Sequence, residues 1–296
     1  MQIGVIGAGH AGVAAAEAAA ATGARVVVYS AEQQLPYFRP KLVAMAVGQM
    51  AIEELLMHPA DWYGQKGIEL RLGARVESFD PATRSLVCDG RRESYDALVF
   101  APGAGPFMPP PLDSAPEGVF PLWTAEHARH IHERLVPGSR LVVIGGGILG
   151  VETALRALEQ KLQVTVMERM PRLMPAQFGP LVAGHLEETL RERGAEVLVG
   201  ASIRSISRGG DVITVALEDG REAKGAAVLV SIGARKNVML AEQAGLKLDR
   251  GGVVVDRQMH TSAPGVFACG DVIELEGVVR CSAVDAVKQG RVAGAN

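Results

Sequence analysis

One short glycine pattern occurs twice in this chain. Residues 7–12 read GAGHAG between QIGVI and VAAAEAAA, and residues 145–150 read GGGILG between RLVVI and VETALRAL. In both places an apolar segment of strand length runs into the glycines, and a segment with helical spacing follows at once. This order of strand, tight turn and helix limits the possible folds more than any other feature of the sequence.

Each glycine of the pattern has its own physical task. The first permits the tight turn, the second lets a pyrophosphate approach the backbone because it has no Cβ, and the third lets the helix pack closely on the strand. The start of the helix then presents N–H groups and the positive end of the helix dipole to the phosphates. Two copies therefore predict two dinucleotide-binding sites. The residues are Gly7, Gly9 and Gly12 in the first copy and Gly145, Gly147 and Gly150 in the second.

Size and composition narrow the class of protein further. A chain of 296 residues is long enough for two domains, and its apolar residues include no run long enough to span a membrane. A net charge of −3 without a basic cluster argues against nucleic acid as a partner. Three scattered cysteines form no disulfide framework, so we expect a cytoplasmic location. No metal site is predicted.

The remaining segments predict an α/β chain with an internal boundary. Residues 105–118 are rich in proline and glycine and are predicted to be a linker. After the second glycine turn, the segments AEVLVG, ASIRSIS and DVITVALEDG predict a small antiparallel layer. The segment GAAVLVSIGARKN predicts a strand and a return connection. Ser282 and Asp285 are spaced as a capping box that begins a last helix.

Four further segments carry a resemblance to a known family. These are LPYFRPKL, YDALVFAPGAG, VTVMERMPRLMP and TSAPGVFACGD. The chain resembles, over essentially its whole length, the FAD-dependent pyridine nucleotide–disulfide oxidoreductase superfamily, and within it the branch of NADH–rubredoxin reductases, ferredoxin reductases and nitrite reductase flavin domains. The resemblance implies two Rossmann-like domains of the FAD/NAD(P)-binding fold, with the second inserted in the first.

The resemblance also implies domain bounds. Residues 1–108 and 233–296 are expected to form a discontinuous FAD-binding domain, and residues 109–232 an NAD(P)H-binding domain. Related reductases continue into a C-terminal interface domain, whereas this chain ends at VKQGRVAGAN, so we expect that domain to be absent.

At the FAD site, one position departs from the family pattern. Family members carry an acidic residue after the second strand that binds the adenosine ribose, but that position holds Ser30, and Glu32 is the nearest carboxylate. Either Glu32 supplies the ribose contact, or the ribose is held less tightly, because a serine cannot make the bidentate contact. The resemblance makes Arg39 a pyrophosphate partner, which suits its planar donor group, and places Lys41 near the flavin as a catalytic residue.

Other residues of the FAD site follow from the same resemblance. Asp271, just after a buried strand, is expected to accept hydrogen bonds from the ribityl hydroxyls of FAD. In the turn after the strand of YDALVFAPGAG, Pro102 replaces the threonine that is usual in the family. Gly103 still allows FAD to approach the backbone closely. The helix that begins at Ser282 is expected to point its N-terminus at the flavin pyrimidine edge. The remaining expected contacts with FAD are Ala11, Val76, Ala101 and Gly270.

At the second site, the acidic position is filled by Glu168 at the end of QVTVME. A carboxylate there binds the ribose hydroxyls of NADH and repels the 2′-phosphate of NADPH, which favours NADH. Arg169 and Arg172 follow closely and could accommodate that phosphate, so NADPH stays open. Glu152 matches a family acid beside the nicotinamide and is the second catalytic candidate. Alternatively, its carboxylate only offsets the positive end of the helix dipole.

The resemblance implies hydride transfer from NADH to FAD and electron transfer to a redox protein such as a rubredoxin-type carrier. Disulfide reductases of the superfamily carry a cysteine beside the flavin, but the corresponding region here, RPKLVAMAVGQM, has none. Cys269 is expected to be buried, with a raised pKa, and inert. Two other interpretations remain open: the flavin subunit of an amine- or opine-type dehydrogenase, and a nucleotide-sensing interaction protein with slow turnover. The sequence does not decide the carrier or the oligomeric state.

Overall fold

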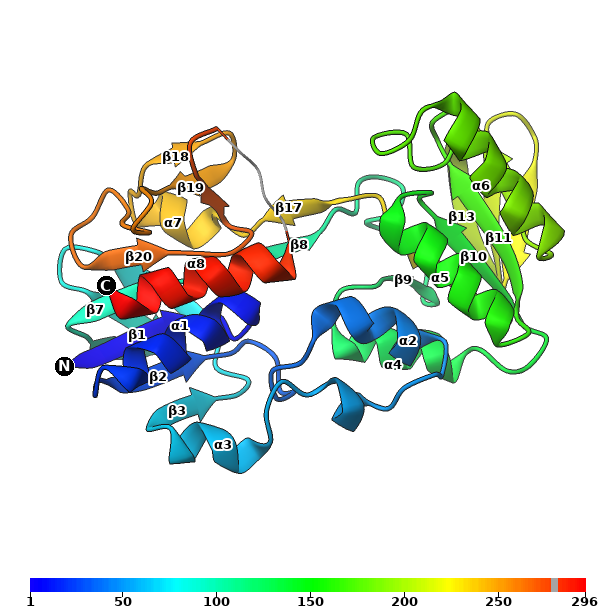
Figure 1. Ribbon diagram of the computed structural model, residues 1–296. Coiled ribbons are helices and arrows are strands. Elements are labelled where there is room, and N and C mark those ends of the chain that lie inside the picture. The colour runs from blue at the N-terminus through cyan, green and yellow to red at the C-terminus, as the bar shows by residue number, and fades with distance from the viewer. Residues whose placement is uncertain (278–281) are drawn as a thin grey trace. The chain divides into compact units, whose positions relative to one another are not determined.

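The computed structural model describes residues 1–277 and 282–296, and over these residues the chain forms two compact units (Figure 1). The first unit comprises Met1–Phe38, Leu56–Gly105 and Arg235–Asn296, and the second comprises Arg39–Leu55 and Pro106–Ala234. Within the described ranges, each unit is built on a five-stranded parallel sheet. The predicted α/β class with two Rossmann-like halves is therefore confirmed. No helix in the described ranges is long and apolar enough to cross a membrane.

The sheet of the first unit has the order β20-β7-β1-β2-β3, and its neighbouring strands run parallel. Its inner strands are almost continuously apolar, as expected for a sheet that is covered on both faces, whereas the edge strand β3 also carries Glu69 and Arg71. The strands are β1 (Gln2–Ile6), β2 (Arg25–Tyr29), β3 (Ile68–Arg71), β7 (Ala97–Phe100) and β20 (Val266–Ala268). Smaller sheets are formed by β4 (Val76–Asp80), β5 (Ser85–Cys88) and β6 (Arg91–Ser94), and by β18 (Leu248–Asp249), β19 (Gly252–Val254) and β21 (Ile273–Glu274). The helices are α1 (His10–Ala21), α3 (Ala60–Gln65), α7 (Met239–Gln243) and α8 (Ala283–Ala295).

Helices α1 and α8 lie side by side, although they come from opposite ends of the chain (Figure 1). A Cβ at Gly290 of α8 would lie 2.2 Å from the carbonyl oxygen of Ala11, and a Cβ at Gly294 would lie 2.1 Å from that of Ala15. The two backbones approach this closely because α1 presents alanines and α8 presents glycines. Ser282 begins α8 by accepting a 3.1 Å hydrogen bond from the N–H of Asp285, which confirms it as the N-cap, and its hydroxyl lies 2.8 Å from the Asp285 carboxylate.

The sheet of the second unit has the order β12-β11-β10-β16-β9 and is also parallel. Its strands are β9 (Val119–Pro121), β10 (Arg140–Ile144), β11 (Gln163–Glu168), β12 (Glu196–Val199) and β16 (Ala227–Val230). An antiparallel sheet contains β13 (Ile203–Gly209), β14 (Val212–Leu217) and β15 (Glu222–Gly225), and the helices are α2 (Leu42–Ala46), α4 (Ala125–Glu133), α5 (Ile148–Glu159) and α6 (Pro180–Glu192). Strands β8 (Ala104–Pro106) and β17 (Ala234–Lys236) pair where the chain passes between the units.

One local prediction for the second unit was wrong, and another was right only in part. The segment AEVLVG does not join the antiparallel layer: it forms β12, which pairs in parallel with β11, because helix α6 provides the long crossover that parallel neighbours need. The boundary between the units lies at Gly105 and Pro106, within the predicted linker 105–118, but the later part of this segment also packs: the side chain of Leu112 is only 4% exposed and lies in the core of this unit with Val142 and Val228.

The segment Arg39–Leu55 also differs from the expected division. The bounds from the resemblance placed it within 1–108, but it packs with the second unit. Helix α2 buries Leu42 and Val43 and contacts α4 and α5. Gly48 lies so close to α4 that a Cβ there would be 2.7 Å from Cε1 of His132. A short apolar helix is stable only when it packs on an apolar surface. Here α4 and α5, which lie far along the sequence, provide that surface.

The close contact between α1 and α8 can be tested with two glycine substitutions. Gly290→Ala should lower the free energy of unfolding by about 1–3 kcal/mol, because the new methyl group overpacks the backbone of α1. As a control, Gly184→Ala places a methyl group on the exposed side of α6, where no described atom lies within 4 Å, and should stabilise the protein by up to about 1 kcal/mol. Urea unfolding of both variants measures the difference. Equal effects would show that α1 and α8 do not pack as described.

Candidate dinucleotide-binding sites

The first glycine turn is closed by its own backbone. Gly7 has a φ of +106°, and a Cβ there would lie 2.2 Å from the carbonyl oxygen of Ala101. A Cβ at Gly12 would lie 1.9 Å from the carbonyl oxygen of Gly7. In contrast, Gly9 is the N-cap of α1, and no described atom lies within 4 Å of the position of its Cβ. The first and third glycines are thus required by packing, and the second faces open space.

The second glycine turn repeats this geometry. Gly145 has a φ of +108°, and a Cβ there would lie 2.1 Å from the carbonyl oxygen of Ser231. A Cβ at Gly150 would again lie 1.9 Å from the carbonyl oxygen of the first glycine, Gly145. Gly147 is the N-cap of α5, and its Cβ position is also open to 4 Å within the described part of the chain. The two glycine turns, which have the same spacing in the sequence, therefore also make the same backbone contacts.

Both turns fit a dinucleotide pyrophosphate. The first-turn N–H groups of a helix have no partner within the helix, and here each helix starts at a glycine whose Cβ position is open. A phosphate can approach such a turn closely and accept hydrogen bonds from it, while the helix dipole stabilises its negative charge. Gly9 and Gly147 are therefore the residues at which a bound pyrophosphate would come nearest to the backbone.

In the first unit, the position after β2 is occupied by a buried serine. The N–H of Ser30 donates to the carbonyl oxygen of Arg71 at 2.9 Å. Its hydroxyl accepts from the N–H of Glu32 at 3.2 Å and lies 3.1 Å from the carbonyl oxygen of the same residue. The Glu32 carboxylate accepts a 2.6 Å hydrogen bond from the hydroxyl of Tyr37. The Ser30 hydroxyl thus forms its hydrogen bonds within its own loop, and the nearest carboxylate in the sequence is that of Glu32, two residues later.

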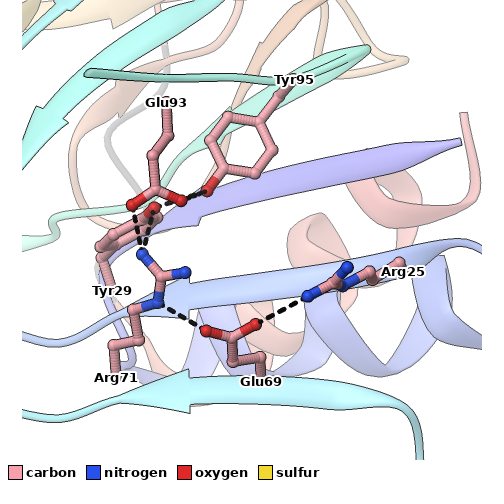
Figure 2. Close-up of polar contacts among 6 residues, drawn as sticks. All are labelled: Arg25, Tyr29, Glu69, Arg71, Glu93 and Tyr95. Carbon is pink, nitrogen blue, oxygen red and sulfur yellow. Dashed lines mark hydrogen bonds and ion pairs between the residues drawn. The ribbon is translucent and has the colours of Figure 1, made fainter. Parts of the chain in front are cut away.

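Arg71 is fixed by a cluster of polar side chains, shown in Figure 2. Its guanidinium donates to Glu93 at 2.5 Å, to Glu69 at 2.7 Å and to the hydroxyl of Tyr29 at 3.1 Å. The hydroxyls of Tyr29 and Tyr95 share a 2.5 Å hydrogen bond. The hydrogen bonds from Arg71 lower the pKa of both carboxyls, and burial raises the pKa of both tyrosines. The cluster therefore fixes Arg71, whose backbone carbonyl accepts the hydrogen bond from the N–H of Ser30.

In the second unit, Glu168 occupies the corresponding position. One carboxylate oxygen accepts from the N–H of Gly146 at 2.7 Å, and the other accepts from the N–H of Met170 at 2.7 Å. An ionised carboxylate offers about four lone-pair sites, so it retains capacity for ribose hydroxyls. Arg169 is exposed, and the guanidinium of Arg172 donates to the carbonyl oxygens of Phe178 and Pro175 at 3.3 and 3.4 Å.

The second catalytic candidate, Glu152, forms an ion pair within α5. Its carboxylate lies 3.0 Å from Nε of Arg156, and Arg156 also donates to the side chain of Gln49 at 2.8 Å. Gln49 in turn donates to Glu159 at 3.1 Å. These contacts tie the segment Arg39–Leu55 to α5, which is a structural role that the sequence did not indicate. A catalytic role for Glu152 stays a prediction.

Arg39 and Lys41 lie in a short 3-10 turn, Arg39–Lys41, that belongs to the second unit. The guanidinium of Arg39 donates to the carbonyl oxygen of Trp123, which precedes the N-cap of α4. The side chain of Lys41 is exposed. Their expected roles with FAD stay predictions.

Asp271 is brought close to the start of α1. It follows Gly270, where a Cβ would lie 2.8 Å from the Cβ of Ala11. The N–H of Gly270 donates to the side chain of Gln289 in α8 at 2.9 Å. The half-buried Asp271 therefore lies at the carboxyl edge of the sheet, where the first glycine turn also lies. The other expected FAD contacts are Ala101, which is buried, Gly103, whose φ is +66°, and Val76, which is buried at the start of β4.

Relatives of known function resemble this chain over most of its length. It is 34% identical over 273 residues to a benzene 1,2-dioxygenase system ferredoxin–NAD(+) reductase subunit from Pseudomonas putida, covering 91% of this chain and 66% of that protein. It is 33% identical to a rubredoxin–NAD(+) reductase from Ectopseudomonas oleovorans, covering 92% of this chain and 71% of that protein. The chain thus spans about two thirds of the length of these relatives.

Solved structures agree with these relatives. The reductase in a covalent putidaredoxin reductase–putidaredoxin complex matches 99% of this chain and 74% of its own chain, with a TM-score of 0.93 and 30% identity. NADH:rubredoxin oxidoreductase from Clostridium acetobutylicum matches 99% of this chain and 74% of its own, with a TM-score of 0.84 and 25% identity. The family model described as pyridine nucleotide-disulphide oxidoreductase matches residues 1–290. With both glycine turns and both sheets in place, the chain belongs to the pyridine nucleotide–disulphide oxidoreductase family.

Proposed function

We propose that the first unit binds FAD, that the second unit binds NADH, and that the protein passes electrons from NADH through FAD to a small redox protein. The observation that carries this proposal is the duplicated glycine turn, in which the first and third glycines have the same backbone contacts in both units and the second glycine is open. Bound FAD would supply a group that accepts an electron pair and releases electrons singly or in pairs. The chain's own part is to bind and orient the two nucleotides.

The assignment of FAD to the first unit is supported by Asp271. Its carboxylate follows a buried strand and stands near the first turn of α1, where it could accept hydrogen bonds from the hydroxyls of a ribityl chain. The preference for NADH is supported by Glu168, whose carboxylate is held at the end of β11 by two backbone N–H groups. A fixed negative charge there favours free ribose hydroxyls over a 2′-phosphate.

A redox protein as acceptor is supported by the state of the cysteines. Cys269 directly follows β20 and is fully buried, and burial raises the pKa of its thiol to about 12, as the sequence predicted. Cys88 is also buried, and burial raises its pKa. Cys281 lies outside the described residues. Thiol–disulfide exchange needs an accessible thiolate, and neither Cys88 nor Cys269 provides one.

The named relatives favour a ferredoxin- or rubredoxin-type acceptor over the amine- or opine-dehydrogenase and nucleotide-sensing alternatives. One relative is called a terpredoxin reductase, and one matching structure is a reductase bound to putidaredoxin. As part of this proposal we place the protein in the cytoplasm, because three scattered cysteines are typical of a reducing compartment.

The proposal predicts a flavin spectrum that responds to NADH. The purified protein, reconstituted with FAD if needed, should be yellow, and anaerobic NADH should bleach the flavin absorbance. With ferricyanide or a rubredoxin as acceptor, NADH should be consumed in steady turnover. A protein that binds FAD but is not bleached by NADH would support the amine- or opine-type alternative. Bleaching without turnover on any carrier would support the sensing alternative.

Removing the cysteines should leave this electron transfer intact. A variant with Cys88→Ala, Cys269→Ala and Cys281→Ser should retain NADH–ferricyanide activity per bound flavin, because no thiol takes part in the proposed reaction. Cavities left by the two buried side chains should lower the free energy of unfolding by about 1–3 kcal/mol. The assay compares the variant with the unchanged protein on ferricyanide and on small disulfides. Disulfide reduction that is lost in the variant would establish a cysteine mechanism instead.

Glu168→Ala should weaken NADH binding and reduce the discrimination against NADPH. The loss of a charged hydrogen-bond acceptor is expected to cost about 1–3 kcal/mol of NADH binding, while removal of the negative charge helps the 2′-phosphate. Titration of both nucleotides gives the ratio of the two dissociation constants, and Glu192→Ala, on the exposed end of α6, is the control. Damage to the loop alone would weaken both nucleotides equally and leave the ratio unchanged.

A further inference from the structure

The loop between β11 and α6 is joined to the second glycine turn at Gly146. The N–H of Gly146 donates to the Glu168 carboxylate at 2.7 Å, and its carbonyl oxygen accepts from the N–H of Met174 at 2.8 Å. A Cβ at Gly146 would lie 2.4 Å from Cδ2 of Leu173 and 2.9 Å from the Cβ of Glu168. The first glycine turn has Ala8 at this place. Gly146 is therefore required by the loop that packs on it, and not by the turn that both units share.

A buried carboxylate on α6 holds the same loop. Glu187 is only 9% exposed, and one of its carboxylate oxygens accepts from the N–H of Leu173 at 3.2 Å. The other carboxylate oxygen lies 3.4 Å from a guanidinium nitrogen of Arg191, one turn further along the helix. Because burial of a carboxylate is unfavourable unless the group is hydrogen-bonded, the bond between Glu187 and the fully buried Leu173 fixes both residues.

The loop backbone is strained at the residue that contacts the glycine turn. Met174 has a φ of +45°, in the left-handed region that is unfavourable for a residue with a side chain. The chain turns back at this point, because the N–H of Phe178 donates to the carbonyl oxygen of Met174 at 2.9 Å. Such a conformation persists only where the surrounding structure determines it. The bonds of Leu173 to Glu187 and of Met174 to Gly146 provide that support.

We infer that Glu187 is a positioning residue for the adenosine ribose of NADH and that it acts through the loop and the glycine turn on the carboxylate of Glu168. This inference rests on the proposed binding of NADH in the second unit. Glu187 fixes the N–H of Leu173, and the next N–H along the chain fixes the carbonyl oxygen of Gly146. The N–H of Gly146 in turn fixes Glu168. A residue that orients a binding group in this way changes affinity without touching the ligand.

The test is the affinity of the FAD-reconstituted protein for NAD⁺ and for an NAD⁺ analogue with a 2′,3′-dideoxyadenosine half, measured by titration calorimetry. NAD⁺ has the same adenosine half as NADH and does not reduce the flavin. Glu187→Asp keeps the negative charge but withdraws the carboxylate from Leu173 by one methylene group. It should raise the dissociation constant for NAD⁺ about 5-fold, as expected when a hydrogen bond to a charged group is disturbed. The analogue has no hydroxyls on its adenosine ribose, so its dissociation constant should be the same for the variant and the unchanged protein.

Three further variants complete the design. Glu187→Gln removes the charge but keeps an acceptor oxygen at the same reach, so its affinity for NAD⁺ should stay within about 2-fold of the unchanged protein. Glu188→Asp is the matched control, since Glu188 is the neighbouring glutamate of α6 and is exposed. This control should bind both ligands with unchanged affinity. Adding Glu187→Asp to Glu168→Ala should cause little further loss of NAD⁺ affinity, because Glu187 acts through Glu168.

The outcomes separate this inference from the proposed function. If the unchanged protein binds no NAD⁺, the proposed function fails. If it binds NAD⁺ and Glu187→Asp has no effect, or if that variant weakens NAD⁺ and the dideoxy analogue equally, only the role of Glu187 fails. The role also fails if Glu187→Gln weakens NAD⁺ binding as much as Glu187→Asp does, because the charge and not the bond to Leu173 would then be responsible.

Discussion

The contact between the third and first glycines of each turn is the constraint on which the rest of the structure depends. In both units a Cβ on the third glycine would lie 1.9 Å from the carbonyl oxygen of the first, so the helix can cross the end of its strand only without a side chain there. This contact directs the start of the helix toward the carboxyl edge of the sheet. Strand, helix and open second glycine then take the same arrangement twice, and this arrangement fits a dinucleotide pyrophosphate.

The first unit depends on a second close approach, between helices from opposite ends of the chain. Gly290 and Gly294 let the backbone of α8 contact that of α1. The same helix supplies Gln289, which accepts from the N–H of Gly270 and so fixes the backbone just before Asp271. The returning segment therefore stabilises the first unit and also sets the position of a carboxylate near the first glycine turn.

The loops after β2 and β11 show how one local task, holding the backbone after a strand, can be met by different residues. After β11 the carboxylate of Glu168 accepts from the N–H of Met170 in its own loop and from the N–H of Gly146 in the glycine turn, and after β2 the hydroxyl of Ser30 accepts from the N–H of Glu32 in its own loop. The serine side chain is short, so any carboxylate at the first site has to come from elsewhere in the loop. The Arg71 cluster stabilises this arrangement. The carbonyl oxygen of Arg71 accepts from the N–H of Ser30, and the Arg71 side chain is bound by Glu69 and Glu93.

Local chemistry was sufficient to predict both glycine turns, the parallel strands that enter them, the cap at Ser282 and the burial of Cys269, because each depends on residues close in sequence. The packing of Arg39–Leu55 with the second unit, the parallel pairing of β12 and the burial of Leu112 were not predictable in this way. Nor was the bond from Tyr37 to Glu32, since the sequence shows the two residues but not which way the loop turns. An apolar segment or a polar side chain indicates only that it needs a partner. Which partner it finds depends on elements far away in the sequence, and only the folded chain brings them together.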